Sequence, residues 1–239
     1  MEYTITLFEE ALIILKEQQK KNKLEGSDIN LNTILLHSLD RLSKNLHSII
    51  ILLKSSPYEN EHLIELGLRN ILTDFFVVAY LFNEKEKSSK IIEDLIDHDK
   101  GRIKKYFVLR GGKGEIPEGY HNESLKSKIS NFPTTTELYK KIIEKITDCT
   151  DATIRTDNAY DKWSYFSKAE HIGWASYLKI NSPIDDYDME KVLLECLISA
   201  MYSAIISQQM LCDLDACKSI KSVYSKIEDY LKARIQPNE

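Results

Sequence analysis

Apolar residues recur at helical spacing along most of the chain. Between residues 30 and 55 they follow one another in alternating steps of four and three, at Leu35, Leu39, Leu42, Leu46, Ile49 and Leu53. This spacing predicts a helix with one apolar side that packs lengthwise against a neighbouring helix. The same periodicity predicts helices over residues 3–24, 58–83, 88–110, 136–148, 158–178, 188–214 and 219–235.

The helix expected over residues 58–83 is apolar on every side in its second half, from Ile71 to Phe82. All-round apolarity predicts a central, buried helix. At the entrance to this segment lie four polar residues, Arg69, Asn70, Thr73 and Asp74. Because an unpaired buried charge costs several kcal/mol, we expect these side chains to pair with one another or with polar groups on another helix.

Glycine and proline are scarce, at eight and five residues, and four of the glycines and two of the prolines fall within residues 111–135. Strand connections are built largely from these residue types, so an all-β fold is excluded. The polar stretch 151–158 and the run Asn181-Ser182-Pro183 are further expected breaks. The sequence therefore predicts an all-α bundle of seven to nine helices, forming a single domain over 1–239 with a loop excursion or hinge at 111–135.

Composition and charge limit the classes of function. Charged residues make up 29% of the chain. The longest charge-free run, Cys196 to Cys212, contains three serines and two glutamines and is too polar to span a membrane. We therefore expect a cytoplasmic chain without a membrane segment. A net charge of −5 disfavours general DNA binding. The four cysteines show no metal-ligand spacing, so we expect no metal and no cofactor. A local basic segment offers a candidate phosphate or RNA contact, or a solvated loop, at Arg102, Lys104, Lys105, Arg110 and Lys113.

A second group of polar residues lies in the helix expected over residues 158–178. Ser167 and His171 are four residues apart, and Trp163 lies one turn earlier, so the three side chains share one face. A histidine beside a hydroxyl can act as a general base, or it can be a packing residue that donates to a carbonyl or hydroxyl. One hypothesis is that Ser167 and His171 meet Arg69 and Asp74 in a cleft.

The polar residues around Arg69 and the group around Ser167 together resemble the motifs of a known family. The run Gly-Leu-Arg-Asn-Ile-Leu-Thr-Asp at 67–74 and the later aromatic, Ser167 and His171 resemble the signatures of a bacterial all-helical family of unknown function. The resemblance covers roughly residues 30–180, and Asp74 stands where that family more usually has glutamate. No settled activity follows from it.

A broader resemblance is to the HEPN superfamily, helical bundles whose catalytic members cut RNA with an arginine followed four to six residues later by histidine. After Arg69 the expected polar Asn70 is present, but Asp74 occupies the position where histidine would be. Arg41 and His47 show the spacing on another helix, where two copies of a symmetric dimer could bring both sets together. Arginine would hold a phosphate and histidine would move a proton, or both residues belong to a solvated face.

A minor alternative is the HD group of metal-dependent phosphohydrolases, which is also all-helical. The run Asp97-His98-Asp99 contains the His-Asp pair, and His62 with Asp157 or Asp161 would complete a ligand set. Two classes of function therefore remain as hypotheses. The first is an HEPN-like toxin or phage-defence effector acting on RNA, and the second is a non-catalytic helical interaction module; in both, the partner is expected to be a second copy or another protein.

Overall fold

The structure is a computed structural model that describes residues 1–21, 30–109, 132–146, 150–169 and 188–235. Within these ranges the chain is entirely helical and contains no strand, so the predicted all-α architecture is confirmed. The described residues form eight α-helices and one short 3₁₀ helix: α1 (Glu2–Lys21), α2 (Leu31–Ser55), α3 (Glu61–Asn83), η1 (Lys85–Lys87), α4 (Ser88–Leu109), α5 (Thr135–Ile143), α6 (Thr150–Ala169), α8 (Met189–Met210) and α9 (Leu214–Ile235).

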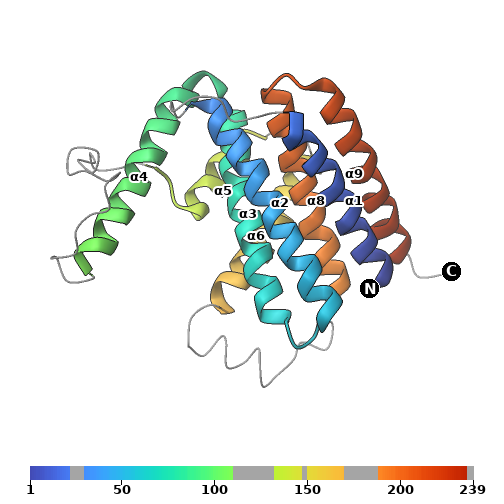
Figure 1. The fold of residues 1–239 in the computed structure, drawn as a ribbon. Helices are drawn as coiled ribbons and strands as arrows, with labels where there is room; N and C mark the ends of the chain where they lie inside the picture. The colour runs from blue at the N-terminus through green and yellow to red at the C-terminus, as the bar shows by residue number, and fades with distance from the viewer. Residues whose placement is uncertain (22–29, 110–131, 147–149, 170–187, 236–239) are drawn as a thin grey trace.

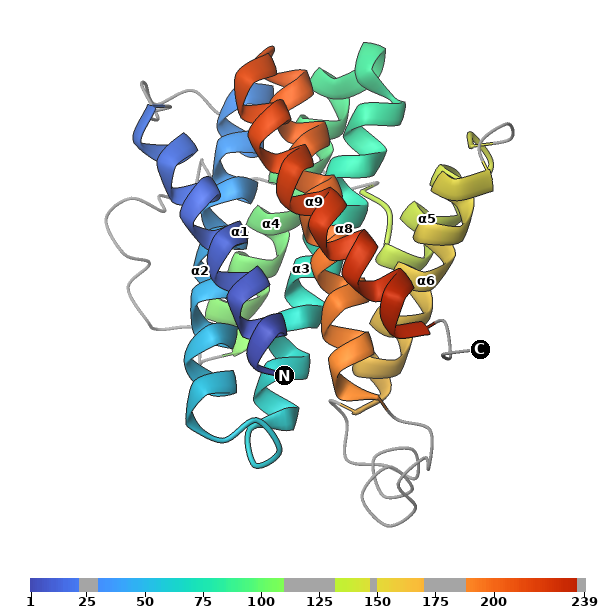
Figure 2. The same ribbon diagram turned by 90° about the vertical axis from the view of Figure 1, so that its right-hand side faces the viewer.

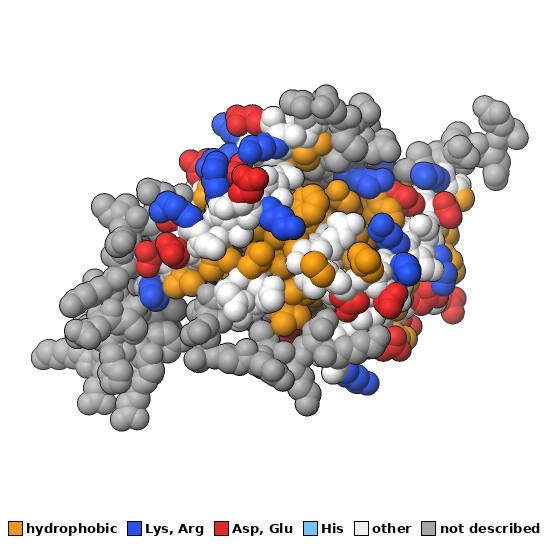
Figure 3. Space-filling view, turned by 90° about the horizontal axis from the view of Figure 1, so that it is seen from above, with side chains coloured by type: hydrophobic (Ala, Val, Ile, Leu, Met, Phe, Trp, Pro, Cys, Tyr) orange, Lys and Arg blue, Asp and Glu red, His pale blue; other side chains and the backbone are white. Residues whose placement is uncertain are grey.

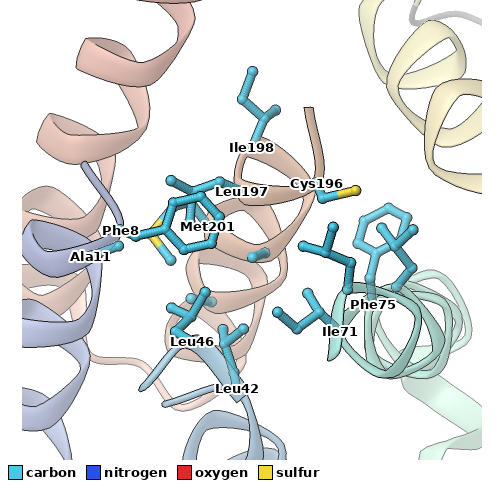
Figure 4. Close-up of a cluster of buried hydrophobic side chains, with 14 of the residues drawn as sticks. Phe8, Ala11, Leu42, Leu46, Ile71, Phe75, Cys196, Leu197, Ile198 and Met201 are labelled. Carbon is cyan, nitrogen blue, oxygen red and sulfur yellow. The ribbon is translucent and has the colours of Figure 1, made fainter. Parts of the chain in front are cut away.

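Five long helices, α1, α2, α3, α8 and α9, run side by side and form the main bundle (Figures 1 and 2). Side chains from four of them meet in the core shown in Figure 4, where Phe8 of α1, Leu46 of α2, Phe75 of α3 and Leu197 of α8 are each at most 1% exposed. Burial of large apolar side chains such as these contributes roughly 1.5–3 kcal/mol each and is the main force holding the bundle together.

The apolar spacing in α2 is fully accounted for by this packing. All six residues of the predicted seam are buried, at 0–5% exposure: Leu35, Leu39, Leu42, Leu46, Ile49 and Leu53. Asn30 caps the helix, since its side chain accepts a hydrogen bond from the Thr33 backbone N–H. Helix α3 approaches α2 closely at Gly67, where an added Cβ would lie 3.0 Å from Cγ1 of Ile49.

The central element of the bundle is α8 rather than α3. Eighteen of the 22 residues of α8 are buried, whereas ten of the 23 residues of α3 are buried and Phe82 is 40% exposed. Helix α8 packs against α1, α2, α3, α6 and α9 at once. The sequence predicted that the helix over residues 58–83 is the central one. In the structure the centre is occupied by α8, which packs next to that helix.

Two helix starts differ from the sequence predictions. The stretch 151–158, expected to be a break, belongs to α6, where Asp157 and Arg155 hydrogen-bond side chains of α5 and α9. Helix α9 starts at Leu214 instead of residue 219. The positive φ of Cys212, 61°, makes the turn from α8 tight, and Asp213 Oδ1 accepts the Ala216 N–H to start the new helix.

Helices α5 and α6 cover one side of α3, and α4 extends away from the bundle from the end of α3 (Figures 1 and 2). A capping box fixes the start of α5, because Thr134 and Glu137 each satisfy the other's backbone N–H. The loop expected at 111–135 lies mostly outside the described residues.

Candidate functional site

Two polar groups that the sequence places about 90 residues apart meet where α3 packs against α6, and Asp74 of α3 is paired with α2. We call this group the polar seam and define it by its six side chains, Arg41, Arg69, Thr73, Asp74, Trp163 and Ser167. The predicted pairing of the α3 residues with polar groups on other helices is confirmed for Arg69, Thr73 and Asp74. Asn70 is exposed.

Arg69 of α3 is joined to Ser167 of α6. Its Nε donates to Ser167 Oγ at 2.9 Å, and the Ser167 hydroxyl donates in turn to the backbone carbonyl of Trp163 at 2.7 Å. The serine is thus oriented by its own helix and presents a lone pair to the guanidinium. Hydrogen bonds to a charged group contribute about 1.5–3 kcal/mol when partly buried, so this bond holds α3 and α6 together.

Trp163 makes the second link between the same two helices. Its indole Nε1 donates to Thr73 Oγ1 at 3.1 Å, and the Arg69 guanidinium carbon lies 5.9 Å from the ring centre, within range of a cation–π interaction. Beyond Trp163 two tyrosines continue the stack: Tyr160 lies 5.8 Å from it and Tyr139 of α5 lies 4.0 Å from Tyr160. The stack helps to pack α5 and α6 onto α3.

Arg41 and Asp74 form the outer part of the seam. Arg41 Nε of α2 donates to Asp74 Oδ2 of α3 at 3.0 Å, although the sequence assigned the two residues to different hypotheses. Burial raises the pKa of Asp74 to about 6, and the charge and hydrogen bond of Arg41 oppose this rise. The carboxyl group therefore changes its charge in the mildly acidic range.

The other candidate residues fall into two sets. His47 is exposed on α2, while its proposed companion Arg41 is held by Asp74. His171, Arg110 and Lys113 lie outside the described residues, and Arg102, Lys104 and Lys105 lie in α4 at positions whose side chains are not described. The described geometry thus pairs Arg69 with Ser167, both from the cleft hypothesis, and separately pairs Arg41 of the dimer hypothesis with Asp74.

The residues considered for a metal site do not form one in the described parts of the chain. His98 Nδ1 lies 3.7 Å from Asp99 Oδ1 on the partly exposed side of α4, and Asp157 accepts the hydroxyl of Tyr139 at 2.8 Å. Among the described residues, no three His, Cys, Asp or Glu side chains come together as metal ligands would. The described helices likewise include none long and apolar enough to cross a membrane.

Sequence reasoning missed two polar features near these helices. Glu65 is 2% exposed and lies one turn before Arg69; the four-residue spacing of an acid and an arginine on one helix could have indicated it. Glu190 of α8 was also missed, although it pairs with the Met1 amine at 2.7 Å and with Arg234 of α9. Its place just after the N-cap Asp188, where acids are favourable, was the available signal.

Comparison with known proteins adds no relative. No protein family matches the sequence, and neither the curated proteins nor the solved structures include a significant match.

Proposed function

We propose that the protein is a non-catalytic helical interaction module, in which the polar seam fixes how the helices pack. The observation that carries this proposal is the mutual engagement of the seam residues across helix boundaries: Arg69 with Ser167, Thr73 with Trp163, and Asp74 with Arg41. A general base or a phosphate-binding arginine needs a free polar atom facing the substrate. Side chains that bond one another between helices are suited to setting register instead.

The partner surface that we assign to the module is the end of the bundle where α3 finishes and α9 starts. Leu214 is 68% exposed and Phe82 is 40% exposed there. Figure 3 views this end and shows a band of hydrophobic side chains between charged groups. Beneath it lies a buried cluster that includes Leu81 and Met210. A continuous apolar surface with a charged border is typical of protein-binding sites.

The competing function, an effector that cuts RNA, is tested in cells. Wild type and a His47→Ala, His171→Ala double variant are expressed from an inducible promoter, and growth and total RNA integrity are followed. We expect intact RNA and equal growth in both cultures. RNA cleavage by the wild type that is lost in the double variant would overturn the proposal and establish the effector function.

The partner surface is tested by site-specific crosslinking in the source organism. A photoreactive phenylalanine derivative replaces Leu214, and in the control it replaces Lys218, whose side chain is 79% exposed one turn later in α9. We expect discrete crosslinked products at position 214 that are weak or missing at position 218. Equal crosslinking at both positions, or none at 214, would show that the apolar end binds no partner.

A further inference from the structure

A cavity of about 210 Å³ lies between α6, α8 and α9, outside the polar seam. Helices α6 and α9 both pack on α8 (Figure 2), and an ion pair between Arg155 of α6 and Glu228 of α9 links them at 2.9 Å. An apolar cavity of roughly 150 Å³ holds a benzene molecule. The space is therefore large enough for one small ring compound.

The cavity combines apolar surface with a few polar groups. Ile198 of α8 and Leu231 of α9 supply the apolar lining. Ile198 is 9% exposed, and Leu231 is partly buried against the hydrophobic core. In small-molecule sites, apolar surface of this kind holds the body of the ligand, and the polar groups set its orientation. Here the ion pair of Arg155 and Glu228 supplies those polar groups.

Arg155 and Glu228 are joined by a single hydrogen bond, from Nη2 of the guanidinium to Oε1 of the carboxylate. The Tyr224 hydroxyl donates to the same Oε1 at 2.7 Å. Glu228 Oε2 and the other guanidinium N–H groups have no hydrogen-bond partner among the described residues. Both side chains line the cavity and are accessible, at 31% and 22% exposure. A free donor and a free acceptor thus lie next to each other in the cavity wall.

Two tyrosines help to fix the position of Arg155. Its guanidinium carbon lies 5.8 Å from the ring centre of Tyr202 and 5.3 Å from that of Tyr224, within range of cation–π interactions. The guanidinium is therefore held by both rings and by Glu228 before any ligand arrives. A binding group that is already ordered loses less conformational entropy when it binds, which favours its use as a ligand contact.

The charges of this pair decide which kind of ligand fits. An anion that accepts from Arg155 would also meet the carboxylate of Glu228, and a cation that donates to Glu228 would also meet the guanidinium. A neutral group with an acceptor next to a donor matches both residues at once. A cyclic amide or amidine on the edge of a planar ring has this arrangement, as the Watson–Crick edges of nucleobases do.

We propose that the cavity binds a small, neutral, planar heterocycle with a cyclic amide or amidine on one edge, the chemistry of a free nucleobase. The acceptor of this edge takes a hydrogen bond from Arg155, and its donor gives one to Glu228 Oε2. The ring lies on Ile198 and Leu231. The site shares no residue with the polar seam or with the apolar end of the bundle, so it goes beyond the proposed function and does not depend on it.

The test uses the purified full chain with uracil, cytosine, adenine and hypoxanthine as probes. Thermal unfolding is the first readout, because a ligand that binds only the folded state raises the Tm in a concentration-dependent way. We expect at least one probe to do so, and calorimetry then compares it with its derivative methylated at the donating nitrogen, which should bind at least about tenfold more weakly. Benzoate and benzylamine, charged rings of similar size, are the controls. The proposal fails if no probe binds, or if the methylated derivative or a charged ring binds as well as the probe.

Variants locate the site. Leu231→Trp fills the cavity from a partly buried position, and Arg155→Lys keeps the charge but removes the planar edge of N–H groups. Lys232→Met, which removes a charge at the exposed rim of the cavity, is the matched control. We expect the first two variants to weaken binding at least about tenfold and the control to change it less than about twofold. Wild-type affinity in Leu231→Trp would place the ligand elsewhere, and a tenfold loss in Lys232→Met would show that the rim ammonium binds it; either result overturns the assignment.

Discussion

The hydrogen bond from Arg69 Nε to Ser167 Oγ joins two helices whose contact residues are 98 positions apart in the sequence. It connects α3 with α6, which also packs on α8. Because the bond is partly buried and one partner is charged, it is a strong determinant of how α6 sits on α3. Its removal provides the most direct test of the structural role that we assign to the polar seam.

Replacing Ser167 with alanine is expected to lower the free energy of unfolding by about 1–2 kcal/mol, because the acceptor of the Arg69 Nε–H is lost. Urea denaturation followed by circular dichroism measures the change. Ser222→Ala, at an exposed position of α9, is the matched control and should change stability by less than about 0.5 kcal/mol. Equal effects of the two substitutions would contradict a structural role for the bond.

Asp74 is expected to make stability depend on pH in a direction unusual for an ion-paired carboxylate. Burial raises its folded-state pKa to about 6 from an ordinary value of 3.8, so the folded protein binds the proton more tightly than the unfolded chain. The favourable contribution is complete below about pH 4 and is lost as the pH rises through 6, by up to about 3 kcal/mol.

The measurement compares the wild type with Asp74→Asn by urea denaturation between pH 4 and 7. The stability of the wild type relative to the variant should fall across this range, and the carbon-13 signal of the Asp74 carboxyl should titrate near pH 6. A relative stability that rises with pH would mean that the Arg41 ion pair outweighs burial.

Gly67→Ala is expected to destabilise the protein by about 1–2 kcal/mol, although alanine favours helix over glycine by about 1 kcal/mol. The added Cβ would lie 3.0 Å and 3.2 Å from side-chain atoms of Ile49, which is fully buried, so Ile49 would have to shift against its neighbours in the core. In an Ile49→Ala background the same substitution should instead stabilise. A double-mutant cycle by chemical denaturation detects this change of sign, and additive effects would contradict the close approach of α2 and α3.

Gln208→Leu is expected to leave stability unchanged or raise it by about 1 kcal/mol. Gln208 is fully buried, and both polar atoms of its side chain lack a hydrogen-bond partner among the described residues. Replacing unsatisfied polar atoms by an apolar side chain of similar size removes a desolvation penalty. Gln209→Leu, at the adjacent exposed position, is the control in thermal denaturation. A loss of more than about 1 kcal/mol in Gln208→Leu alone would show that this amide is satisfied in solution.

The sequence predicted the helices and their apolar faces well, because helical spacing is a local property. The apolar residues of α2 from Leu35 to Leu53 are the clearest case, and the helix predicted to begin at residue 188 is another, since the Asp188 side chain accepts the Lys191 N–H at 3.0 Å and caps α8. The centre of the bundle was misplaced because serines and glutamines in α8 made that helix look less buried than α3. The charge-free run from Cys196 to Cys212 was the signal for its position.

The candidate site was predicted only in part because pairing across helices depends on their arrangement in space. The sequence suggested that Arg69 and Ser167 would meet, and they are hydrogen-bonded. It did not join Arg41 to Asp74, since no local pattern relates residues on two helices that are 33 positions apart. The roles assigned to His47, His171 and the basic residues remain predictions.

The central position of α8 has a consequence for how the chain folds during synthesis. Residues 189–210 are translated after α1, α2 and α3, yet they cover the apolar faces of all three. Until α8 has left the ribosome, the core that buries Phe8, Leu46 and Phe75 is incomplete. Contacts between such distant segments form slowly, and the apolar surface that α1, α2 and α3 expose before α8 packs on them favours aggregation. Chaperones that hold apolar segments would therefore act on this protein chiefly before its last two helices emerge.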